Sequence, residues 1–100
     1  VGFSFIPLNE IIFAQASSNY TNFTLKDGTN INSSKPLKYY EERLNHAIFF
    51  RSSRSYIINL SFITEIKKGR NWSIILSNNY TFSTTKNELL LKTLQEIKYL

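Results

Sequence analysis

The sequence FFRSSRSYIINL, residues 49–60, decides the fold. Its two apolar ends predict strands at 48–50 and 56–58, because Phe, Tyr and Ile pack well on a pleated, buried surface. Between them stand two Arg and three Ser, which predict a loop facing solvent. Arg presents a bidentate fork that fits phosphate oxygens and the guanine edge in the major groove. The stretch therefore predicts a strand, a loop suited to nucleic acid and a second strand; a loop kept polar only for solubility is the alternative.

Further strands are predicted on both sides of this unit. Periodicity and β-branched or aromatic residues place them at 11–13, 20–25 and 29–32 before it, and at 63–66, 72–76 and 80–83 after it. The pair Asp27-Gly28 predicts a tight hairpin turn with positive φ at both residues. The pair Asn78-Asn79 predicts a second two-residue turn, since Asn tolerates positive φ.

Two helices interrupt the strands. Pro36 suits a first helical turn, so a helix is predicted over residues 37–44. Its apolar stripe is Leu37, Tyr40 and Leu44. Thr85 and Glu88 have the spacing of a capping box, which predicts the start of a second helix. Its apolar face consists of Leu89, Leu90, Leu94 and Ile97. The expected fold class is mainly β, with one short helix in the middle and one at the C-terminus.

Composition favours a single domain over residues 1–100 and argues against enzymatic chemistry. The chain is 42% hydrophobic and 15% aromatic, which is enough to form a core. It has no Cys, which excludes disulfides and thiolate sites and fits a cytoplasmic location. No apolar run approaches the roughly 20 residues of a membrane span, and three glycines cannot build a phosphate-cradling loop. We expect no enzyme, no catalytic residue, no metal and no cofactor.

Isolated polar and aromatic residues have structural interpretations. The single His46 follows the first predicted helix, where the dipole favours a His. Glu41 and Glu42 are adjacent on that helix, point about 100° apart and are expected to be surface charge. Asn59 is expected to cap or close a turn. Packing in the core or on a sheet face is expected for Trp72 and Tyr56.

Positive charge is concentrated in one part of the chain. The net charge is +5. The segment 51–86 has one acidic residue, Glu65, and six basic ones, Arg51, Arg54, Lys67, Lys68, Arg70 and Lys86, so it carries the whole net charge. Such a segment attracts a polyanion, and phosphate neutralisation is its usual reason. A solvated basic surface is the alternative.

The segment from Phe49-Phe50 to Ile63 resembles the pattern FxRxHxSYIVNxxxI of the LytTR domain, the DNA-binding output module of many bacterial response regulators. Other family features occur in the same order: residues 11–13 followed by 16–20, the Asp27-Gly28 turn, the helix before Phe49-Phe50, and a closing strand that runs into Thr85-Lys86. The resemblance covers the chain from residue 10 to the end. The single motifs are moderately specific, and their order and spacing together are highly so.

The resemblance implies a fold of short antiparallel sheets packed in layers and recognition of double-stranded DNA by loops that enter successive major grooves. It also implies tandem repeat sites in promoters, bending of the duplex and self-association on DNA. The chain does not begin with Met and starts within an apparent strand. We therefore expect a piece of a longer regulator with a receiver or sensor region before it.

Carried over residue by residue, the resemblance implies three DNA-contacting loops: one at 18–20, one around Arg51 and Arg54, and one at Lys86. Contacts to bases are expected from Arg54, Lys86 and Asn19. Contacts to the DNA backbone are expected from Arg51, Ser53, Ser18, Tyr20, Thr85 and Lys67. Family members commonly have His at the position of Ser53 and Arg at that of Lys86, and these two departures bear on which bases are read.

Two rival interpretations stay open at this stage. One is a strand-rich protein-interaction module with a basic docking face, which would show no preference among duplex sequences. The other is an RNA-binding domain, which would bind single strands more tightly than duplex.

Overall fold

The chain forms two antiparallel sheets and two α-helices in a computed structural model that describes residues 5–46 and 48–97. One sheet has the strand order β3-β2-β1-β5-β4 and consists of β1 (Ile11–Ser17), β2 (Tyr20–Leu25), β3 (Asn30–Ser33), β4 (Phe49–Arg51) and β5 (Tyr56–Asn59). The other has the order β6-β7-β8 and consists of β6 (Ile63–Lys67), β7 (Trp72–Leu76) and β8 (Thr81–Thr84). The helices are α1 (Leu37–Glu41) and α2 (Asn87–Glu96), and the short 3-10 segments are η1 (Leu8–Glu10), η2 (Leu60–Phe62) and η3 (Ser77–Asn79). The predicted mainly β class, with layered sheets and two helices, is confirmed.

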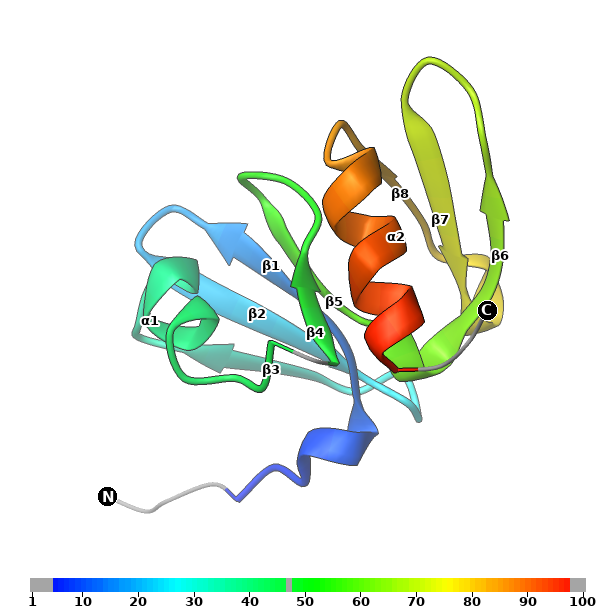
Figure 1. Cartoon of the computed structure of the whole chain (residues 1–100). Helices are drawn as coiled ribbons and strands as arrows, with labels where there is room; N and C mark the ends of the chain where they lie inside the picture. Colours follow the sequence, from blue (N-terminus) through cyan, green and yellow to red (C-terminus); the bar gives the residue numbers. More distant parts are fainter. Residues whose placement is uncertain (1–4, 47, 98–100) are drawn as a thin grey trace.

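The main core lies between the two sheets and α2, and Figure 1 shows that helix between them. Leu90 and Leu94 of α2 are almost fully buried there against β1, β5, β7 and β8. A second core lies on the other face of the five-stranded sheet, under α1 and the segment that precedes β1. Helix α2 therefore fixes the position of the two sheets relative to each other.

A bulge in β1 lets this strand contribute side chains to both cores. Pairing with β2 shifts in register between Ile11 and Phe13, so Ile12 is the extra residue. As a result Ile12 and Phe13 both face the main core, while Ile11 and Ala14 face the second one. This explains why four consecutive residues of β1 are buried.

Both predicted hairpins form, but neither has the predicted turn. At Asn78 and Asn79 the φ angles are 65° and 64°, so the predicted positive φ is confirmed. The connection is residues 77–80, longer than the predicted two-residue turn, and the Leu76 N–H donates to the Tyr80 carbonyl at 2.8 Å. At Asp27-Gly28 the hairpin forms, but only Gly28 has a positive φ, 89°. Its N–H donates to the Leu25 carbonyl at 2.9 Å, and the loop has four residues. The prediction of positive φ at both residues was wrong, because a longer loop needs only one left-handed position.

The predicted end of the first helix, residue 44, and the predicted start of the second helix required correction. Helix α1 ends at Glu41, and Pro36 is its N-cap. The capping box of Thr85 and Glu88 is not formed in the described part of the chain. The N-cap of α2 is Lys86, whose N–H donates to the hydroxyl of Thr84 at 3.1 Å. Strand β8 extends to Thr84, so α2 begins one residue later than the spacing of Thr85 and Glu88 predicted.

Several structural interpretations of single residues are confirmed. The buried side chain of Asn59 accepts from the Ser61 N–H and donates to the Ile11 carbonyl, each at 2.8 Å. His46 bonds the Glu41 carbonyl at the end of α1 through Nε2. Trp72 and Tyr56 pack partly buried against the main core. Among the described helices, none has the length and apolar character to cross a membrane.

Candidate nucleic-acid interface

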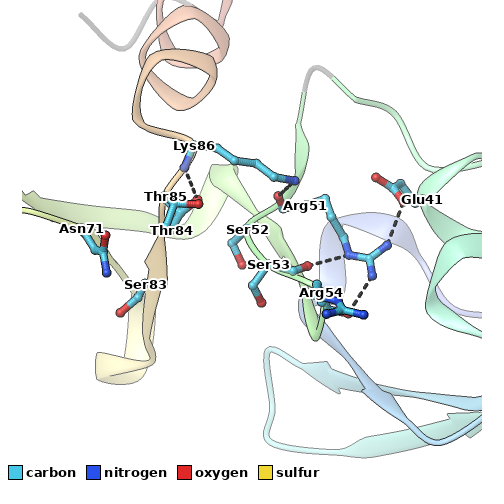
Figure 2. Close-up of a pocket in the computed structure, with 10 residues that line it drawn as sticks. All are labelled: Glu41, Arg51, Ser52, Ser53, Arg54, Asn71, Ser83, Thr84, Thr85 and Lys86. Carbon is cyan, nitrogen blue, oxygen red and sulfur yellow. Dashed lines mark hydrogen bonds and ion pairs between the residues drawn. The ribbon is translucent and has the colours of Figure 1, made fainter.

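A surface hollow of about 440 Å³ lies between the β4–β5 loop and the start of α2. One side is lined by Arg51, Ser52, Ser53, Arg54 and, from α1, Glu41. The other side is lined by Asn71, Ser83, Thr84, Thr85 and Lys86. Figure 2 shows these polar side chains on the two facing segments. Segments that are far apart in sequence thus form one polar, cationic surface.

The guanidinium of Arg51 is held within the protein. It donates to Glu41 Oε1, to the Ser53 carbonyl and to the Arg54 carbonyl, each at 2.7 Å. The Arg51 side chain is only 19% exposed. Glu41 was expected to be surface charge, and that prediction was wrong because β4 brings Arg51 to the end of α1. Glu42 remains exposed, and its contact with Arg43 is long, 3.8 Å.

Arg54 and Lys86 differ from Arg51 because their charged groups are exposed to solvent. Arg54 is exposed, and its guanidinium bonds no described residue. Lys86 is exposed as well, and its Nζ donates to the Arg51 carbonyl at 3.0 Å. Thr85 is exposed beside it. The edge of the hollow therefore carries cations that can meet a ligand from solvent.

The β1–β2 turn lies beside the β4–β5 loop. The Ala16 N–H donates to the Ser55 carbonyl at 2.8 Å, which ties the end of β1 to that loop. Ser18 and Asn19 form the turn, with φ of 57° at Ser18, and Tyr20 begins β2 with 56% of its surface exposed. Figure 1 shows this turn, the β4–β5 loop and the β8–α2 connection along one edge of the molecule.

The predicted contact residues are thus partly brought together. Five of them line the hollow: Arg51, Ser53, Arg54, Thr85 and Lys86. The three in the β1–β2 turn lie next to it without lining it. Lys67 is exposed at the end of β6, in the hairpin that forms a separate projection in Figure 1.

The predicted contact residues leave out half of the residues that line the hollow: Glu41, Ser52, Asn71, Ser83 and Thr84. Ser52 is 2% exposed, and its Oγ has no hydrogen-bond partner among the described residues. Ser83 is exposed and alternates along β8 with the buried Phe82 and Thr84. This alternation, in a strand that leads into Thr85-Lys86, was the sequence signal that could have placed Ser83 at the site. Nothing in the sequence pattern paired Glu41 with Arg51.

A β-rich domain with this edge is a nucleic-acid-binding module. Three cationic side chains line the hollow against a single carboxylate, and that carboxylate is already paired. Such a surface suits phosphate and base edges. The family profile described as the LytTr DNA-binding domain matches residues 2–98. The chain belongs to the LytTR family of DNA-binding domains, and the resemblance seen in the sequence is confirmed.

Individual relatives agree with this assignment. The transcriptional regulatory protein LytR of Staphylococcus aureus strain MW2 is 48% identical over 46 residues, which are 44% of this chain and 19% of that protein. LytR of strain N315 is 46% identical over 46 residues, which again are 44% of this chain and 19% of that protein. The match therefore spans about a fifth of the length of these regulators.

A solved structure confirms the fold. The LytTr DNA-binding domain of a methyl-accepting/DNA response regulator from Bacillus cereus superposes with a TM-score of 0.78 at 18% identity. The superposition covers 89% of this chain and 84% of that one. The same arrangement of sheets and helix thus forms from a sequence that is largely different.

Proposed function

We propose that this domain binds double-stranded DNA in a sequence-specific manner, as the output domain of a bacterial response regulator. The observation that carries the proposal is that Arg54 and Lys86, from distant segments of the chain, lie on facing sides of the hollow. A protruding loop with a free guanidinium can enter a major groove and read a base edge. The β1–β2 turn at the same edge provides a further contact.

Arg54, Lys86 and Asn19 are the proposed base-contacting residues. The exposed guanidinium of Arg54 can donate two parallel hydrogen bonds to guanine O6 and N7. Lys86 can contact the same acceptors with a less directional ammonium group once it leaves the Arg51 carbonyl. Asn19 stands exposed at the tip of the β1–β2 turn, and its side-chain amide can pair with adenine.

The remaining contact residues are proposed to hold the DNA backbone. Hydroxyl groups and a positive helix N-terminus are suited to phosphate oxygens, which fix register without reading sequence. This role is proposed for Ser18, Ser53, Tyr20, Thr85 and, farther along the duplex, Lys67. Arg51 has two of its five N–H donors left for a phosphate, since three are used within the protein.

The biological setting is also part of the proposal. The regulator acts in the cytoplasm on tandem repeats in promoters, with copies that associate on DNA and a receiver or sensor region that controls them. The domain has no catalytic role, because binding alone would direct transcription.

Selection from a random duplex library at physiological salt tests the proposal. The result expected is enrichment of a short motif, with direct repeats about two helical turns apart when two copies bind. A folded domain that enriches no duplex would contradict sequence-specific binding. Tighter binding to single strands than to duplex would point to RNA, and binding only to a protein partner would point to a docking module.

A further inference from the structure

We infer that Glu41, which lies in α1 outside the predicted contact residues, is a positioning residue for DNA recognition. It acts through Arg51 to hold the β4–β5 loop, residues 52–55, in the conformation that presents Arg54. The inference rests on the proposed function, since it assigns a role to Glu41 within that same site.

The guanidinium of Arg51 holds the β4–β5 loop from one side. It joins three acceptors at 2.7 Å each, and two of them are carbonyls of the loop itself, those of Ser53 and Arg54. The third acceptor is the Glu41 carboxylate. A planar guanidinium fork can meet several acceptors in fixed directions at once. Glu41 therefore sets the orientation of the group that holds the loop carbonyls.

Hydrogen bonds hold almost every carbonyl of the β4–β5 loop. Besides the two bonds from Arg51, the Arg51 carbonyl accepts from Lys86 Nζ and the Ser55 carbonyl accepts from the Ala16 N–H. The Ser55 N–H in turn donates to Ser53 Oγ at 3.2 Å. Ordering a flexible residue costs conformational entropy, so a loop that is ordered before binding avoids that cost on DNA. The hydrogen bond from Lys86 Nζ to the Arg51 carbonyl also connects the Glu41–Arg51 pair to the opposite side of the hollow.

The negative charge of Glu41 opposes DNA binding electrostatically. A carboxylate near phosphates is unfavourable, and its removal alone should strengthen binding to any duplex. The side chain is partly exposed, at 38%, and lines the hollow. Positioning and electrostatics thus predict opposite effects for the same substitution, which makes the inference testable.

Glu41→Gln is the test, with Glu42→Gln as the matched control. Both remove one negative charge from neighbouring positions, but Glu42 has no bond to the loop and is 60% exposed. Affinity would be measured for the selected duplex and for an unrelated duplex at the same salt concentration. For Glu42→Gln we expect both affinities to rise by roughly twofold, from charge alone. For Glu41→Gln we expect the affinity for the unrelated duplex to rise in the same way and the affinity for the selected duplex to fall about tenfold.

Arg51→Lys is the second variant. It keeps the positive charge but cannot meet the three acceptors with one planar fork. A loss of about tenfold in affinity for the selected duplex, larger than the loss for the unrelated duplex, is expected if Arg51 holds the loop. Affinity close to that of the wild type on both duplexes would show that Arg51 acts only as a charge near phosphate, and would overturn the inference.

A measurement without DNA completes the test. Amide hydrogen exchange of the Ser55 N–H should be faster in Glu41→Gln than in the wild type and unchanged in Glu42→Gln, with equal thermal unfolding. If Glu41→Gln and Glu42→Gln change both affinities in parallel, the positioning role is wrong. A wild-type domain that prefers no duplex would instead contradict the proposed function, while the exchange result would still report on the loop.

Discussion

Replacement of Asn59 by Ala should destabilise the domain by about 3 kcal/mol, since two buried hydrogen bonds are lost and their partners are left unpaired. Asn59 is 2% exposed, and its amide links the start of β1, at the Ile11 carbonyl, to the turn after β5, at the Ser61 N–H. Each bond contributes about 1 kcal/mol net, and the orphaned buried groups add roughly another. For a domain of this size the melting temperature should fall by about 12 °C or more.

Urea unfolding followed by the fluorescence of Trp72, the single tryptophan, measures this effect. Asn22→Ala is the control, because Asn22 Nδ2 donates to Asn32 Oδ1 at 2.7 Å in an exposed bond. Its loss should change stability by no more than about 0.5 kcal/mol. A cost below about 1 kcal/mol for Asn59→Ala, or equal costs for the two variants, would refute the reasoning from burial.

Three further outcomes are expected. Gly28→Ala should cost about 1 kcal/mol, because φ is 89° while the space for a Cβ is open; no loss in urea unfolding would contradict this. Thr84→Val should lower the free energy of unfolding by about 1 kcal/mol, because the bond from the Lys86 N–H is lost, whereas Glu88→Ala should change it by no more than about 0.5 kcal/mol. A larger cost for Glu88→Ala than for Thr84→Val would support the capping box instead. Lys86→Ala should weaken DNA binding with its thermal transition intact, and a collapsed transition would make its role structural.

Much of the strand pattern could be predicted from sequence, because alternation and turn residues act locally. Strand β7 is found as expected, and Asn78 and Asn79 have the expected positive φ. The bulge at Ile12 could not be predicted, since it depends on the pairing partner in β2. The start of α2 was misplaced by the spacing of Thr85 and Glu88, because the end of β8 decides where the chain turns.

The candidate site shows the same division. The basic and hydroxyl residues around Arg54 and Lys86 were predicted from composition and from the family pattern, which are properties of the sequence. The pair of Glu41 and Arg51 is a tertiary contact between the end of a helix and an edge strand, so no local pattern contains it. The buried Ser52 was missed for the same reason.

Parallel selection of duplexes by the wild type and by Arg54→Ala tests most directly that this edge reads DNA. The wild type should enrich one motif, and the variant should lose the preference at one position of it, with a cost of about 1–3 kcal/mol on the original site. Enrichment of the same motif with the same stringency by both proteins would contradict the role of Arg54. A folded wild type that enriches nothing would contradict sequence-specific recognition by this domain.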